Sequence, residues 1–157
     1  MSVEERCRAL GLEIPAAPPP VAAYVPGVRA GQLLFTSGQL PVAGGEVVFR
    51  GRIGAELSPA DGYEAARLCA LNCLGVIRSV AGSLEQVEQV VQITGYVRSA
   101  PGFEGQPGVV NGASELVLAV FGEAGRHARA ALGVAELPLG AAVELTMVVK
   151  LQDDRRR

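Results

Sequence analysis

Apolar residues follow two different periods along this chain. Between residues 21 and 48, short apolar runs such as Leu33-Leu34-Phe35 are separated by turns rich in Gly and Pro, which predicts a strand meander. Ser58-Pro59 can open the longest helix, because serine caps a helix N-terminus and proline is tolerated in the first turn. The apolar stripe of this helix has helical spacing up to Gly82 and consists of Ala66, Cys69, Cys73, Val76, Ile77 and Val80.

Strand and helix patterns alternate in the second half of the chain. Residues 87–97 are rich in β-branched residues and predict a strand, residues 109–121 predict a second helix, and residues 127–134 and 142–151 predict two final strands. A turn at 136–140 separates these two strands, so we expect them to form a hairpin. The order β-β-β-α-β-α-β-β predicts an α/β (α+β) domain: one mixed sheet of about six strands with two helices on one face.

The ends of the chain differ from this pattern. We assign residues 1–20 to an N-terminal extension, with a short helix at 3–11 that ends at Gly11 and a Pro-rich connector, Pro15 to Pro20, laid over a surface. Residues 21–152 then form one domain, and residues 153–157 form a disordered tail. The second face of the predicted sheet remains apolar and uncovered in a monomer, which predicts association through that face.

Composition narrows the functional classes. The 157 residues carry a formal net charge of −2 and no tryptophan, so no long-range attraction to nucleic acid or anionic lipid is expected. No window approaches the ~20 apolar residues of a membrane span. An odd number of cysteines, three, and a charged N-terminus indicate reduced thiols in the cytoplasm. Cys69 and Cys73 could form a metal or redox pair, but we favour packing in the core.

Candidate chemistry rests on polar residues within strands. The sequence has no phosphate-binding glycine loop, no HExxH and no GxSxG, and we interpret its single histidine, His127, as a surface or capping residue. Arg129 stands between alanines, where burial is costly unless the guanidinium meets an anion. Glu144 is isolated among apolar residues. In a hairpin the two would lie close together, either at a small-carboxylate site, as a structural ion pair, or on a solvated face.

Several motifs resemble one known family. They are Thr36-Ser37-Gly38-Gln39-Leu40-Pro41-Val42, then Ala128-Arg129-Ala130, Leu137-Pro138 and Val143-Glu144-Leu145. Together they resemble the RidA (YjgF-like) reactive intermediate deaminase family, from about Tyr24 to Leu151. The resemblance implies a chorismate-mutase-like fold and a homotrimer with sites between subunits. It also implies cofactor-free hydrolysis of enamine or imine acids such as 2-aminoacrylate to 2-oxo acids and ammonia.

The resemblance also assigns residue roles. Arg129 matches the arginine that holds the substrate carboxylate, and Glu144 matches the glutamate beside the attacking water. Four further residues match positions that line the cleft: Tyr24, Ser37, Gly38 and Asn111. Packing or capping is an alternative role for Tyr24, Ser37 and Asn111.

One departure from the family pattern concerns the position two residues after the arginine. Ala131 stands where many members have a cysteine, so no thiol assists, although the backbone at this position could still bind substrate. A binding module for small carboxylates without turnover is therefore the alternative function. Ribonuclease activity, a label often attached to this family, fits poorly with an acidic chain that has one histidine.

Overall fold

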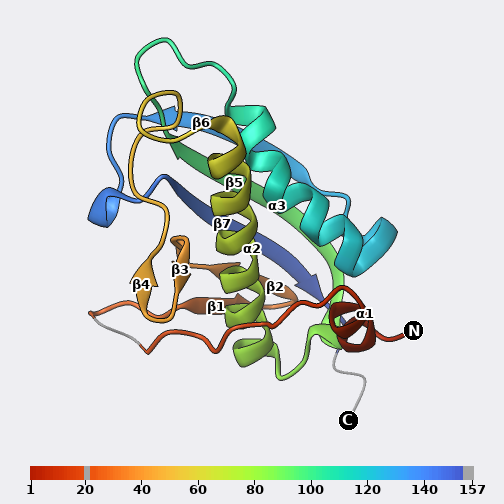
Figure 1. Cartoon of the computed structure of the whole chain (residues 1–157). Helices are drawn as coiled ribbons and strands as arrows, with labels where there is room; N and C mark the ends of the chain where they lie inside the picture. Colours follow the sequence, from red (N-terminus) through yellow and green to blue (C-terminus); the bar gives the residue numbers. More distant parts are fainter. Residues whose placement is uncertain (20–21, 154–157) are drawn as a thin grey trace.

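The computed structural model describes residues 1–19 and 22–153. Its main feature is a five-stranded sheet with helices on one face (Figure 1). The strand order is β1-β2-β7-β5-β6. The elements are α1 (Val3–Ala9), β1 (Gly27–Ala30), β2 (Leu33–Thr36), β3 (Val42–Ala43), β4 (Glu46–Val47), α2 (Pro59–Ala81), β5 (Val87–Arg98), α3 (Gln106–Phe121), β6 (Ala128–Val134) and β7 (Val143–Leu151). The predicted class, a mixed sheet with helices on one face, is confirmed.

Helix α2 begins and ends where the sequence predicts. The hydroxyl of Ser58 accepts the amide of Asp61, whose carboxylate accepts the amide of Ser58, so that two otherwise unpaired donors are satisfied. The helix ends at Gly82, whose φ of 86° is easily adopted only without a side chain. Helix α3 begins three residues earlier than predicted, because Pro107 is accommodated in its first turn.

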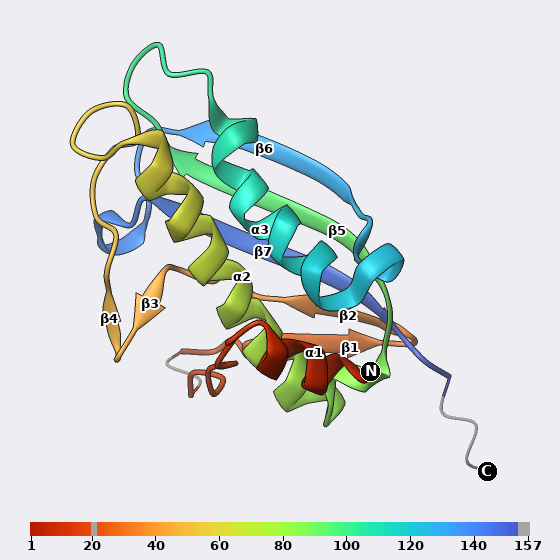
Figure 2. The same cartoon turned by 45° about the vertical axis from the view of Figure 1, so that its right-hand side comes forward.

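The core lies between these two helices and the sheet (Figure 2). Strand β7 alternates strictly, with five buried residues facing the helices: Val143, Leu145, Met147, Val149 and Leu151. Cys69 and Cys73 are wholly buried there, and desolvation raises the pKa of the Cys73 thiol to about 12. Both thiols donate to backbone carbonyls of β7. Their complete burial confirms that this pair packs in the core.

Two details of the predicted sheet are wrong. The main sheet has five strands rather than about six, because β3 and β4 pair only with each other in a separate ribbon. The last two strands do not form a hairpin: β5 lies between them, parallel to β6 and antiparallel to β7. A strand followed by a helix returns most readily as a parallel neighbour, so β5, α3 and β6 form a crossover unit that excludes β7 from β6.

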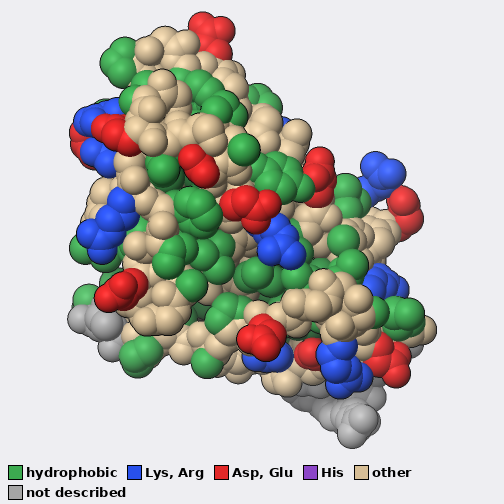
Figure 3. Space-filling view, in the orientation of Figure 1, with side chains coloured by type: hydrophobic (Ala, Val, Ile, Leu, Met, Phe, Trp, Pro, Cys, Tyr) green, Lys and Arg blue, Asp and Glu red, His purple; other side chains and the backbone are tan. Residues whose placement is uncertain are grey.

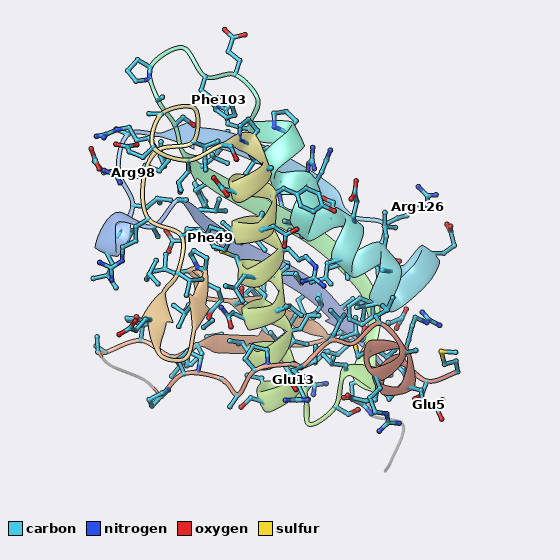
Figure 4. All side chains as sticks on the ribbon, in the orientation of Figure 1. Glu5, Glu13, Phe49, Arg98, Phe103 and Arg126 are labelled. Atoms are coloured by element: carbon cyan, nitrogen blue, oxygen red, sulfur yellow. The ribbon has the colours of Figure 1, made fainter. Side chains whose placement is uncertain are left out.

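The described part of the N-terminal segment lies across helix α2. Arg78 donates from Nη2 to the carbonyl of Ile14 at 2.8 Å. A Cβ on Gly75 would lie 3.2 Å from the carbonyl carbon of Pro15, so the glycine permits this close approach. Figure 4 places Glu13 of this segment beside α2. Residue 20 of the connector and residues 154–157 of the predicted tail lie outside the described residues.

No described segment of the protomer covers the sheet face opposite the helices. Val28, Phe35 and Leu132 point to this side and are 53%, 43% and 47% exposed. On the helix side, hydrophobic side chains lie among charges of both signs (Figure 3). Within residues 1–19 and 22–153, no helix combines the length and apolar character needed to cross a membrane.

Candidate functional site

Arg129 lies on β6 and reaches toward helix α3. Its register partner on β5 is Ile93, which is buried beneath the helices, so the arginine side chain leaves the sheet on the helix side. Nη1 of Arg129 donates to Oδ1 of Asn111 at 2.7 Å and to Oγ of Ser114 at 3.2 Å. Asn111 and Ser114 are three residues apart on α3, which places both on one face of the helix. The guanidinium is therefore held at one end by two neutral acceptors.

The rest of the guanidinium is available to a ligand. Both hydrogens of Nη1 are engaged, whereas Nε and Nη2 have no acceptor within the described part of the chain. No carboxylate of residues 1–19 and 22–153 lies within ion-pair distance of Arg129. The Nε and Nη2 hydrogens form the planar edge that binds a carboxylate through two parallel hydrogen bonds. Arg129 is exposed, so an anion can reach this edge.

Glu144 lies on the opposite side of the sheet. Its register partner on β5 is Tyr96, and both belong to the set of residues that alternate away from the buried, helix-facing positions. The side chain is half-buried, and desolvation raises the pKa of its carboxyl above the ordinary value of 4.5. An elevated pKa makes the carboxylate a stronger base than an exposed glutamate.

Gly38 provides the space for Glu144. A Cβ at Gly38 would lie 2.8 Å from Cδ of Glu144, closer than carbon atoms pack. The next residue, Gln39, pairs with Leu145 through two backbone hydrogen bonds of 2.9 and 3.0 Å, which fixes this segment against β7. The absence of a side chain at Gly38 thus allows the carboxyl group of Glu144 to lie directly against the backbone.

The other predicted residues separate into two groups. Tyr24 and Gly38 line one cavity of about 210 Å³, and Oγ of Ser37 donates to the carbonyl of Val25 at 2.6 Å. With Glu144 these residues form what we call the glutamate half-site. Ala131 belongs to the other group. It lies two residues after Arg129 on the same side of β6, and its register partner on β5 is Gly95.

The second group is the arginine half-site, which consists of Arg129, Asn111, Ser114 and Ala131. The expectation that Arg129 and Glu144 lie close together within one chain is wrong, and so is a direct ion pair between them. Strand β5 separates β6 from β7, and the two side chains leave opposite faces of the sheet. The two half-sites therefore cannot close around one small ligand within a single protomer.

Two residues of the arginine half-site region were not predicted. His127 is half-buried, with Nδ1 2.7 Å from the carbonyl of Gly125 and Nε2 2.9 Å from Oγ of Ser114. Our interpretation of His127 as a surface or capping residue accounts for its contact with Gly125 but not for its contact with Ser114. Ser114 could have been proposed from its spacing to Asn111, since residues three apart share a helix face.

Comparisons with known proteins agree on one family. Residues 4–151 match the family model described as "YjgF/chorismate_mutase-like, putative endoribonuclease". Protein TCP17 of Trypanosoma cruzi is 46% identical over 145 residues, 92% of this chain and 91% of that protein. Atu1372 of Agrobacterium tumefaciens superposes with a TM-score of 0.89 at 41% identity, covering 96% and 92% of the two chains. A structure from Shewanella oneidensis, titled a "putative endoribonuclease", gives 0.93 at 32% identity, covering 96% and 100%.

Proposed function

Because the chain belongs to the RidA (YjgF/chorismate-mutase-like) family, we propose that it hydrolyses small enamine or imine carboxylic acids of the 2-aminoacrylate type. The products are a 2-oxo acid and ammonia, and no cofactor takes part. The observation that carries the proposal is the state of Arg129. One end of its guanidinium is held by Asn111 and Ser114, and its bidentate edge is left for a carboxylate.

The reaction proceeds in three steps. Arg129 binds the substrate carboxylate and so fixes the neighbouring imine carbon. A water molecule beside Glu144 attacks this carbon, its proton passes to the Glu144 carboxylate, and the C=N double bond becomes a single bond in a tetrahedral adduct. Glu144 returns this proton to the nitrogen, and it then accepts the hydroxyl proton of the adduct and passes it to the nitrogen as well. The C–N bond breaks, ammonia leaves with three hydrogens, and the C=O double bond forms. Because imines are intrinsically labile toward water, positioning accounts for much of the acceleration.

Two copies of the chain are needed to assemble this site. The arginine half-site and the glutamate half-site lie on opposite faces of the sheet, so one copy contributes Arg129 and a neighbour contributes Glu144 with Tyr24, Ser37 and Gly38. We propose a homotrimer, in which three equivalent clefts form between neighbouring subunits. The uncovered sheet face with Val28, Phe35 and Leu132 supports burial against another copy.

The test measures ammonia release from an imine made in situ by an amino-acid oxidase or a dehydratase. We expect the wild-type protein to accelerate release over buffer and Arg129→Ala to abolish the acceleration. Arg126→Ala is the matched control, because Arg126 is an exposed arginine nearby whose only ion-pair partner in the described part of the chain is Glu123. Analytical ultracentrifugation on the same samples establishes the assembly state. A trimeric wild-type protein without acceleration would refute the proposal.

A binding module is the second candidate, and Ala131 is the observation that favours it. The family cysteine is absent at this position, so the same cleft could capture a 2-oxo acid without turnover. Calorimetry with 2-oxobutanoate separates the two functions. Binding that Arg129→Ala abolishes, together with unchanged imine lifetimes in the presence of wild-type protein, would establish the binding module and exclude the hydrolase.

A further inference from the structure

Behind Arg129 lies a chain of three hydrogen bonds that the proposed reaction does not use. It runs from Nη1 of Arg129 to Oγ of Ser114 (3.2 Å), from Ser114 to Nε2 of His127 (2.9 Å), and from Nδ1 of His127 to the carbonyl of Gly125 (2.7 Å). Ser114 and His127 come from different elements, helix α3 and the segment that leads into β6. Both are half-buried, whereas Arg129 is exposed.

The direction of each hydrogen bond follows from donor chemistry. A backbone carbonyl only accepts, so Nδ1 of His127 carries the hydrogen shared with Gly125. In the neutral imidazole, Nε2 is then an acceptor. The hydroxyl of Ser114 must therefore point its hydrogen at His127. Its lone pairs are left to face Arg129, whose guanidinium only donates.

We propose that His127 is a positioning residue for the carboxylate site: it orients the hydroxyl of Ser114, which in turn holds Nη1 of Arg129. A serine hydroxyl alone rotates freely and can present either its hydrogen or its lone pairs. With the hydrogen fixed on His127, Ser114 always presents an acceptor to the guanidinium. The bidentate edge of Arg129 is thereby preset before the ligand arrives, which lowers the ordering cost of binding. The ligand in this proposal is the carboxylate of the proposed function, on which the inference rests.

The hydrogen-bond chain can be tested without any ligand, because His127 is the only histidine. Long-range ¹H–¹⁵N spectra of the wild-type protein should show one imidazole, in the Nδ1–H tautomer, with Nε2 shifted by an accepted hydrogen bond. Ser114→Ala should move the Nε2 resonance and leave that of Nδ1 almost unchanged. An Nε2–H tautomer, or the averaged signals of a freely exchanging imidazole, would overturn the proposal.

The effect on the carboxylate is tested by calorimetry with 2-oxobutanoate. We expect His127→Phe and Ser114→Ala each to weaken binding about tenfold, equivalent to about 1.4 kcal/mol at 25 °C. His127→Gln should recover part of the loss, because its side-chain carbonyl can again accept the hydrogen of Ser114. In the hydrolysis assay the substitutions should raise KM more than they lower kcat, as expected for lost ground-state binding. Arg126→Ala should bind like the wild-type protein.

The outcomes distinguish the two proposals. If the wild-type protein binds 2-oxobutanoate and folded His127→Phe binds it equally well, the positioning role is refuted and the proposed function stands. If the wild-type protein neither binds the acid nor hydrolyses the imine, the proposed function and the positioning role for a carboxylate both fail. The tautomer of His127 then tests the hydrogen-bond chain independently of any ligand.

Discussion

Replacing Gly38 by alanine tests whether the carboxyl group of Glu144 needs its observed position. The φ angle of Gly38 is not in the left-handed region, so alanine fits the backbone and the substitution adds only a methyl group. That methyl carbon would lie 2.8 Å from Cδ and 3.1 Å from Cγ of Glu144. Carbon atoms pack at about 3.5–4.0 Å, so the glutamate side chain has to retreat by about 1 Å.

The expected loss of stability is small and the expected loss of activity is large. The displaced atoms are the far end of a flexible, half-buried side chain, so the cost should lie near ~1 kcal/mol, the lower end for overpacking. A misplacement of about 1 Å in a catalytic group can cost on the order of 100-fold in rate. We therefore expect kcat/KM for the imine to fall by roughly that factor.

A double-mutant cycle checks the reasoning. Urea unfolding and ammonia release are measured for Gly38→Ala, Glu144→Ala and the double variant. Because Glu144→Ala removes the side chain with which the methyl group would collide, Gly38→Ala should cost almost nothing further in that background. Equal losses in both backgrounds, within about 0.3–0.5 kcal/mol, would show that the two sites act independently. Full activity of the single variant Gly38→Ala would also refute the prediction.

Three further predictions concern the helix contact and the two half-sites. Gly112→Ala would bring a Cβ to 2.9 Å from the carbonyl carbon of Tyr63, so urea unfolding should show a loss of about 1–3 kcal/mol. Gly108→Ala on the same helix meets nothing within 4 Å and should be neutral or stabilising by less than about 1 kcal/mol. Arg129→Lys keeps the charge but loses the planar fork, so calorimetry should show binding of 2-oxobutanoate at least ~10-fold weaker. Burial raises the pKa of Glu144, so the folded state holds this proton more tightly than the unfolded state does, and stability is lost as pH rises above 4.5 through the folded pKa. Glu144→Gln should not show this decline in urea titrations across that range, and parallel curves would contradict the assignment.

The sequence predicts well those elements whose boundaries are set by local chemistry. Ser58-Pro59 and Gly82 delimit α2 because a cap, a tolerated proline and a left-handed glycine act within one helical turn. The last strand, predicted at residues 142–151, is observed as β7 at Val143–Leu151, where apolar and polar residues alternate. Such signals do not depend on which other segments lie nearby.

Strand pairing depends on more distant parts of the chain, and there the prediction was wrong. The turn at 136–140 suggests a hairpin, yet β6 pairs with β5 through the crossover helix α3. The predicted hairpin would place Arg129 beside Glu144, whereas in the structure β5 lies between their strands. The motif resemblance selected both residues without giving their geometry. Ser114 and His127 meet only because α3 packs beside β6, and no local pattern records that contact.

The three buried cysteines can report two different opening motions of the protein through the rates at which their thiols are modified. A thiol-specific reagent attacks the thiolate, and burial raises the pKa of Cys7, Cys69 and Cys73, so the native molecule reacts slowly at every one of them. Cys7 belongs to α1, whereas Cys69 and Cys73 belong to the central turns of α2 and face the core. The rate at which Cys7 is modified should therefore report how often the N-terminal segment detaches. The rates at which Cys69 and Cys73 are modified should report how often the whole domain opens, so one labelling experiment measures both events.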